Sequence, residues 1–222
     1  MEYKRITLFA GHYGSGKTNI AVNYAIAMRK AGYPVRIADL DIVNPYFRTK
    51  DSADRLAAAG IELISSAYAN TNVDIPALPA QMYALTDDKS THAVMDIGGD
   101  DRGALALGRY APAILAEGEY EMLFVANMYR PLTRTPEEAL EVMREVETAG
   151  GIPFTAIVNN SNIGAETKPA DVLASVSFAD ALSRLAGLPV KMTTVREDLT
   201  DALSGKIENL FPLALQKKYA WS

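Results

Sequence analysis

A glycine-rich segment near the N-terminus constrains the fold of this chain most. Residues Gly11–Thr18, G-H-Y-G-S-G-K-T, fit the pattern G-x-x-x-x-G-K-[ST]. The apolar run Ile6–Ala10 before it predicts a strand, and apolar residues at helical spacing over Thr18–Ala31 predict a helix after it. Glycines let backbone N–H groups turn inward as an anion nest, and a following helix adds its positive end. The segment therefore predicts a phosphate-binding loop; a tight strand–helix turn without a ligand is the other interpretation.

The rest of the chain continues this alternation of strands and helices. Further strands are expected at Val35–Asp39, Ile61–Ser65, His92–Asp96, Glu121–Ala126, Phe154–Asn159 and Pro189–Val195. Helices are expected at Arg48–Ala59, in a short segment up to about Leu85, and at Arg102–Leu115, Pro136–Gly150 (with Thr135 as N-cap) and Pro169–Ala186. Continuous apolar strands are typical of a parallel sheet that helices cover on both faces. We expect an α/β fold of three layers, αβα, with a mostly parallel central sheet.

Length and composition narrow the class of protein. The chain has 222 residues, which predicts one domain over residues 1–222. It has no cysteine, so no thiolate can hold an iron–sulfur cluster or zinc or form an acyl intermediate. His12 and His92 are its two histidines, too few for a histidine-rich metal site. An oxygen-ligated magnesium site stays possible. The net charge of −5 disfavours a dedicated nucleic-acid-binding protein.

Neither end of the chain predicts association with a membrane. The N-terminal apolar run is too short for a signal peptide, and no segment approaches the roughly 18–20 apolar residues of a membrane span. We therefore expect a cytoplasmic protein. Residues Leu203–Lys218 show apolar positions at helical spacing, but Pro212 interrupts them. We expect this segment to dock on the core rather than to form an amphipathic membrane helix.

Acidic residues follow two of the predicted strands. Asp39 and Asp41 form a D-x-D pair, whose carboxylates point to the same side when the chain is extended. Asp96 ends another strand, as expected of a carboxylate that holds magnesium, and Gly99 three residues later offers a bare backbone N–H. The alternative is that these acids cap helices or lie solvated in loops.

The motifs together resemble the MinD/ParA/CobQ-type P-loop ATPases of the SIMIBI class. The resemblance rests on G-x-x-G-S-G-K-T, on A-D-L-D, on D-I-G-G-D and on the I-V-N-N of Ile157–Asn160. It implies the P-loop NTPase fold, with ATP and Mg²⁺ as ligands. It also implies that the nucleotide is contacted by Gly11, His12, Tyr13, Gly14, Ser15, Gly16, Lys17, Thr18, Asn19 and Gly99.

Carried over by position, the resemblance implies a role for each polar residue. Lys17 contacts the β- and γ-phosphates, and Asp41 positions or activates the attacking water. Thr18, Asp39 and Asp96 surround the magnesium ion, and Gly99 senses the γ-phosphate. Asn159 contacts adenine, with Asn160 as the fallback. The sequence holds no N-K-x-D motif, so ATP is favoured over GTP.

One departure from the family lies in the phosphate loop itself. The MinD/ParA loop begins with a lysine that reaches across a dimer, whereas His12 and Tyr13 occupy this part of the loop here. These two side chains stack on a ligand or simply pack in the loop. Arg102, Arg130 and Arg134 are candidates for a replacement cation, and the alternative is that they are solvated.

Two classes of function fit these motifs. The first is an ATPase that switches conformation with its nucleotide and acts on a protein partner, with a nucleotide-dependent homodimer possible. The second is an ATP-dependent kinase or ligase of the dethiobiotin synthetase/CobQ type, with Ser66–Pro79 lining a small-molecule pocket. Asn44–Arg48 binds a partner or packs against the next helix. DNA binding is not expected, because the net charge opposes it.

Overall fold

Eight parallel strands form one sheet in the computed structural model, which describes residues 2–40, 52–65, 84–99, 105 and 107–215. The strands are β1 (Ile6–Ala10), β2 (Val35–Leu40), β3 (Glu62–Ser65), β4 (His92–Ile97), β5 (Tyr120–Ala126), β6 (Ala156–Asn159), β7 (Val190–Arg196) and β8 (Leu210–Leu213). Their order across the sheet is β3-β2-β4-β1-β5-β6-β7-β8, and each neighbouring pair is parallel. The predicted sheet is confirmed, and its described strands are all parallel.

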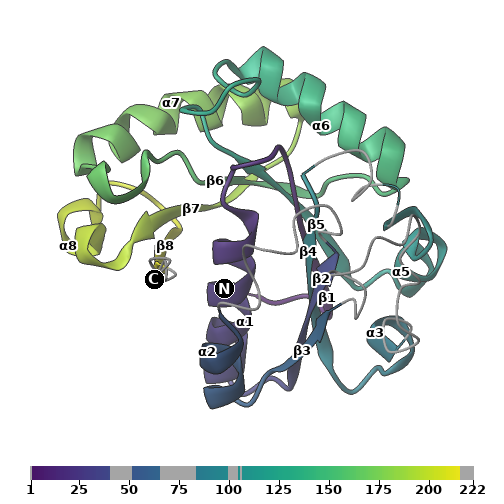
Figure 1. The fold of residues 1–222 in the computed structure, drawn as a ribbon. Helices are drawn as coiled ribbons and strands as arrows, with labels where there is room; N and C mark the ends of the chain where they lie inside the picture. Colours follow the sequence, from purple (N-terminus) through teal and green to yellow (C-terminus); the bar gives the residue numbers. More distant parts are fainter. Residues whose placement is uncertain (1, 41–51, 66–83, 100–104, 106, 216–222) are drawn as a thin grey trace, which may run out of the picture.

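Helices cover both faces of the sheet (Figure 1). They are α1 (Lys17–Lys30), α2 (Ala53–Ala58), α3 (Ala84–Asp87), α5 (Ala111–Glu117), α6 (Pro136–Gly150), α7 (Pro169–Ala186) and α8 (Thr200–Leu203), with short 3₁₀ turns η3 (Gly164–Glu166) and η4 (Glu197–Leu199). Helices α1 and α2 pack on one face, and α3, α5, α6 and α7 pack on the other. The predicted three layers are therefore confirmed. Within the described helices, none has the length and apolar character needed to traverse a bilayer.

Strand β1 shows why the strands are apolar throughout. Ile6, Leu8 and Ala10 point into the core under α5, α6 and α7, whereas Phe9 points into the core under α1. All four side chains are fully buried. Successive side chains of a strand point to opposite faces, so a strand covered on both faces has no solvent-facing position.

The C-terminal segment departs from its predicted helical spacing. Leu210–Leu213 is a strand, β8, which pairs in parallel with β7 at the edge of the sheet. Pro212 fits there because an edge strand has an unpaired side that needs no N–H donor. Phe211 and Leu213 join the core under α1, so the predicted docking on the core is confirmed.

The helix predicted at Arg102–Leu115 is interrupted in the structure. Leu105, Leu107 and Gly108 are helical, residues 109 and 110 form a turn, and α5 then runs over Ala111–Glu117. Tyr110 is its N-cap and a proline lies in its first turn, which favours a helix start at this point. Gly118, with φ of 73°, ends it.

Candidate functional site

The glycine-rich loop lies at the carboxyl end of the central strand β1 and leads directly into α1. Gly16 is the N-cap of α1 and has a left-handed conformation, with φ of 93°. Its carbonyl accepts a hydrogen bond from the N–H of Ile20 at 3.2 Å, which begins the helix. A Cβ at position 16 would lie 2.3 Å from Nδ2 of Asn160, so both the backbone angle and the space require glycine.

Inside the loop, the backbone carbonyl of His12 accepts two hydrogen bonds. The O atom of His12 accepts hydrogen bonds from the N–H of Ser15 and from Nζ of Lys17, each at 3.2 Å. Lys17 and Thr18 are only 4% exposed. The hydroxyl of Ser15 is buried and has no hydrogen-bond partner among the described residues. The loop is thus a compact turn whose lysine folds back over it.

Oxygen ligands gather beside the first turn of α1. Thr18 donates a hydrogen bond from Oγ1 to Oδ2 of Asp96 at 2.5 Å, and Asp96 is 1% exposed. Asp39 lies opposite Asp96 in the register of β2 and β4, so the two carboxylates leave the same face of the sheet. A hydroxyl and carboxylates are the ligands that Mg²⁺ prefers. The residues present therefore fit a magnesium ion.

Gly99 follows β4 and packs against the phosphate loop. A Cβ on it would lie 2.7 Å from the backbone nitrogen of Tyr13 and 2.8 Å from Nζ of Lys17. These are distances that real side chains do not reach, so this contact between two segments requires glycine. The predicted sensor glycine is therefore brought beside the predicted phosphate-contacting lysine.

The two asparagines at the end of β6 are both engaged within the fold. Asn159 is fully buried; its Nδ2 donates to Oγ of Ser175 at 2.9 Å, and its Oδ1 accepts from Oγ of Ser161 at 2.8 Å. An adenine contact by this side chain would have to replace these bonds. Asn160 donates from Nδ2 to the carbonyl of Ser15 at 2.6 Å and accepts from Oγ1 of Thr194. Asn160 thus ties the phosphate loop to β7.

Sequence reasoning missed Asn127, which joins two loops at this edge of the sheet. Its Oδ1 accepts from the N–H groups of Tyr129, at 3.0 Å, and Asn162, at 3.3 Å. Its carbonyl accepts from Oγ1 of the buried Thr133 at 2.8 Å. An asparagine directly after an apolar strand is the signal in the sequence that could have indicated it.

The remaining predicted residues include some that the structure does not describe. Asp41, Arg102, Asn44–Arg48 and Ser66–Pro79 lie outside the described residues. Tyr13 is 54% exposed, and Nδ1 of His12 lies 3.0 Å from the carbonyl of Tyr13. Asn19 accepts a hydrogen bond from Asn23 through its carbonyl. Of the arginines, Arg130 lies against the phosphate loop, whereas Arg134 is exposed beside the first turn of α6.

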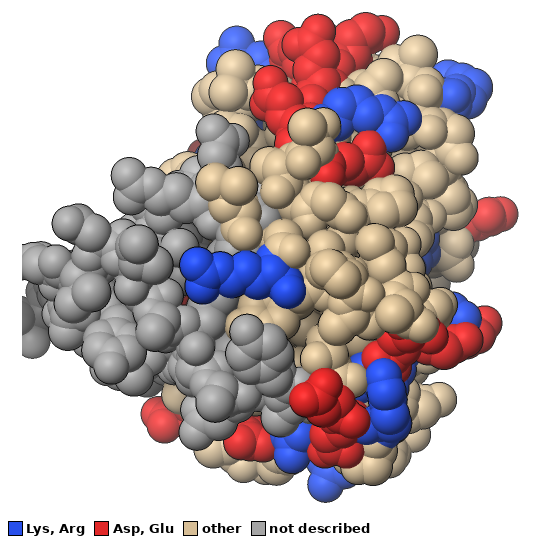
Figure 2. Space-filling view, turned by 90° about the vertical axis from the view of Figure 1, so that its right-hand side faces the viewer, with Lys and Arg blue, Asp and Glu red and all other residues tan. Residues whose placement is uncertain are grey.

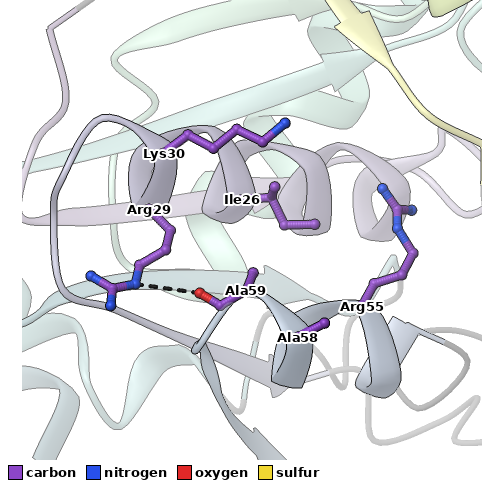
Figure 3. A pocket seen from close by; sticks show the side chains of 6 residues that line it. All are labelled: Ile26, Arg29, Lys30, Arg55, Ala58 and Ala59. Atoms are coloured by element: carbon purple, nitrogen blue, oxygen red, sulfur yellow. Dashed lines mark hydrogen bonds between the residues drawn. The ribbon is translucent and has the colours of Figure 1, made fainter.

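A hollow of about 740 Å³ lies away from this loop, between α1 and α2 (Figure 3). Arg29, Lys30 and Arg55 line it together with small and apolar residues. Arg29 donates to the carbonyl of Ala59 at 3.3 Å, and the three cationic side chains point in different directions in Figure 3. At about 1.5 Å per residue along α1, the hollow lies roughly 15–20 Å from Lys17. It is therefore separate from the phosphate loop.

Charged residues are mixed on the side of the molecule that carries α3 and α5. Figure 2 shows acidic and basic side chains beside one another at the upper and lower parts of this face, with mostly uncharged residues and a basic side chain between them. The described part of this face thus shows no extended patch made of basic residues alone.

Solved structures provide the comparison with known proteins. FtsY from Mycoplasma mycoides matches with a TM-score of 0.60 and 18% identity, over 87% of this chain and 60% of that chain. The cell division protein FtsY from Thermotoga maritima matches with a TM-score of 0.59 and 18% identity, over 86% of this chain and 61% of that chain. The chain has the fold of a P-loop NTPase.

A third match extends the comparison to a liganded protein. The signal recognition particle receptor FtsY from Elizabethkingia anophelis, solved in complex with GDP, matches with a TM-score of 0.52 and 14% identity, over 88% of this chain and 58% of that chain. The chain thus spans about three fifths of the length of these P-loop NTPase structures. No family model and no curated protein sequence matches it.

Proposed function

We propose that this protein binds a purine nucleoside triphosphate with Mg²⁺ at Gly11–Thr18 and hydrolyses it, and that the nucleotide state switches its conformation toward a protein partner. One observation supports this proposal above the others. The phosphate loop stands at the end of β1, and the hydroxyl of its last residue, Thr18, contacts the carboxylate of Asp96 on the adjacent strand β4 at 2.5 Å.

The described residues suit the binding of a triphosphate. Backbone N–H groups of the loop and the N-terminus of α1 supply partial positive charge without an ordering step. Lys17 adds a full charge and has to exchange its bond to the carbonyl of His12 for phosphate oxygens. Thr18 and Asp96 would hold Mg²⁺, and Asp39, opposite Asp96 in the sheet, would support the shell of ligands around the ion. The ion would neutralise charge on the phosphates.

Hydrolysis needs a group that orients the attacking water, and we assign this role to Asp41. This assignment comes from the D-x-D pair and the family resemblance. Asp39, its described partner in the motif, is placed by β2 next to the Thr18–Asp96 contact. We assign Gly99 as the residue through which the γ-phosphate would act on the rest of the chain, because it leaves no room for a side chain between itself and Tyr13 and Lys17.

The base is proposed to be adenine, because the chain lacks an N-K-x-D motif. The FtsY of Elizabethkingia anophelis was solved with GDP, so guanine nucleotides are the necessary comparison. Tighter binding of GTP than of ATP would overturn the choice of base and leave the phosphate site in place.

The experiment is equilibrium binding of fluorescent ATP and GTP analogues, with magnesium and with a chelator, followed by steady-state release of phosphate. Lys17→Ala removes a charged contact and should weaken triphosphate binding about 10- to 100-fold. Lys30→Ala, at the other end of α1, is the matched control and should bind as the wild type does. Asp41→Ala should bind ATP but release little phosphate. Wild-type protein that binds neither nucleotide would contradict the proposal.

The partner and assembly state follow from the same proposal. A nucleotide switch that acts through dimerisation should sediment as a dimer with a non-hydrolysable triphosphate and as a monomer with the diphosphate. Identical sedimentation in both states would contradict the homodimer and leave a different protein as the partner.

A further inference from the structure

We infer that Arg130, in the loop between β5 and α6, contacts the phosphates of the bound nucleotide, an assignment that rests on the proposed function. Arg130 lies against the backbone of the phosphate loop. A Cβ at Gly14 would lie 3.9 Å from Nε and 4.0 Å from Cδ of this arginine. Gly14 has no side chain, so the stem of the arginine lies directly over the turn.

The hydrogen-bonding capacity of Arg130 is unused within the described residues. Its Nε is buried and has no hydrogen-bond partner there, and no ion pair among these residues includes its guanidinium. Other arginines have carboxylate partners: Arg36 pairs with Glu62 at 2.7 Å, and Arg196 pairs with Asp198 at 2.5 Å. A buried donor without a partner is unfavourable, and a charged one more so. A phosphate oxygen would supply the acceptor.

The loop that carries Arg130 is held in place before any ligand binds. The N–H of Arg130 donates to the carbonyl of Asn127 at 3.1 Å, and the same carbonyl accepts from Oγ1 of Thr133. The hydroxyl of Tyr129 donates to the carbonyl of Asp171 at 3.0 Å, which ties the loop to α7. Ligand binding therefore has to order only the side chain of Arg130 and not its backbone, which lowers the entropic cost of binding.

Chemistry favours a phosphate over other anions as the ligand of this group. Arginine presents several N–H donors in one plane, which matches the oxygens of a phosphate. The neighbouring loop already offers amide donors and Lys17 for the same ligand. A second cation beside the same loop would strengthen binding of the triphosphate more than binding of a monophosphate.

The experiment compares Arg130→Ala and Arg130→Lys with Arg134→Ala, a control arginine that is exposed four residues later. Dissociation constants are measured for ATP, ADP and AMP, and again for inorganic tripolyphosphate, which has no base. Arg130→Ala should weaken ATP and tripolyphosphate binding about 10- to 100-fold. It should change AMP binding by less than about threefold, and Arg130→Lys should restore part of the loss. Melting temperatures without nucleotide should stay close to that of the wild type.

The outcomes separate this inference from the proposed function. Wild-type and Arg134→Ala proteins that bind ATP equally, together with an unchanged affinity in Arg130→Ala, would overturn the role of Arg130 alone. An equal loss for AMP and ATP would also overturn it, because it would indicate a structural effect on the loop. Wild-type protein that binds neither ATP, GTP nor tripolyphosphate would overturn the proposed function and this inference together.

Discussion

At the scale of single residues, Gly99 decides whether two segments of the site can touch. The backbone of Tyr13 and the amine of Lys17 occupy the space where any side chain at position 99 would begin. The glycine is therefore needed for contact rather than for an unusual backbone angle. A methyl group here has to displace backbone, which cannot give way as the end of a flexible side chain can.

Gly99→Ala should weaken triphosphate binding at least about tenfold and lower the free energy of unfolding by about 1–3 kcal/mol, because overpacking shifts the loop. Nucleotide titration and urea unfolding measure the two effects. Gly108→Ala is the matched control, since its Cβ would meet only the carbonyl of Ala149 at an ordinary 3.8 Å. Equal affinities in all three proteins would show that the contact does not matter for binding.

His92, at the start of β4, predicts a pH dependence of stability. Burial lowers the pKa of its imidazole, and the charge of Arg5 lowers this pKa further. As the pH falls, the imidazole of the unfolded chain takes up a proton near its ordinary pKa of about 6.5. The imidazole of the folded chain takes up its proton only at a lower pH, so protonation favours the unfolded chain. The free energy of unfolding should therefore fall as the pH drops through about 6.5.

Urea unfolding at pH 7.5 and pH 5.5 measures this loss. His92→Phe keeps a ring against Tyr33, whose centroid lies 4.6 Å away, but cannot titrate. The variant should lose less stability between the two pH values than the wild type. Lowered pKa values of Asp88 and Asp198 act at lower pH, below about 4, and leave this interval unaffected. An unchanged difference between the two pH values would contradict the role of His92.

At the scale of elements, α6 shows how local sequence sets a helix start. Thr135 accepts a hydrogen bond from the N–H of Glu138 at 3.2 Å, and Glu138 accepts one from the N–H of Thr135 at 3.3 Å. This capping box satisfies two backbone donors that the first turn leaves open. The predicted start at Thr135 is confirmed because all the groups involved lie within four residues.

Thr135→Ala should reduce the free energy of unfolding by about 1 kcal/mol, because the side-chain acceptor of the cap is lost. Chemical denaturation measures the total, and amide hydrogen exchange should show faster opening in the first turn of α6. Thr135→Ser keeps the hydroxyl and serves as the control. If Ser and Ala variants are equally unstable, the hydroxyl is not the cause.

Other elements show where local patterns fail. The helical spacing of the C-terminal segment did not predict β8, because a strand at a sheet edge is stabilised by pairing with β7 rather than by its own residues. The adenine contact expected of Asn159, with Asn160 as the fallback, stays a prediction; the structure shows both side chains bonded within the fold. Their partners, Ser175 and Ser15, were not predictable, because they come from segments that are distant in the sequence.

At the scale of the whole molecule, β8 closes the core under α1. Phe211 is 8% exposed, and its ring centroid lies 6.0 Å from that of Tyr24 in α1. The carbonyl of Ala214 accepts a hydrogen bond from Nδ2 of Asn23 at 3.0 Å. The C-terminal strand is thus bound to the same helix that begins at the phosphate loop.

Phe211→Ala should lower the free energy of unfolding by about 3 kcal/mol, because it leaves a cavity between β8 and α1. Leu215→Ala removes an exposed side chain from the same segment and should change stability by less than about 0.5 kcal/mol. Thermal and urea unfolding measure both variants. Similar, small losses in both would indicate that β8 adds little to the core.

The sequence by itself determined the features that depend on neighbouring residues. These are the glycine-rich turn between β1 and α1, the alternation of strand and helix, and the cap of α6, which all depend on residues close together in the sequence. Only the tertiary structure decided which distant residues meet. Asn160 reaches Ser15, Asp39 lies opposite Asp96, and Arg130 lies over Gly14, because the order of strands in the sheet brings their carboxyl ends to one edge. That order is set by long-range pairing and burial, which no local pattern contains.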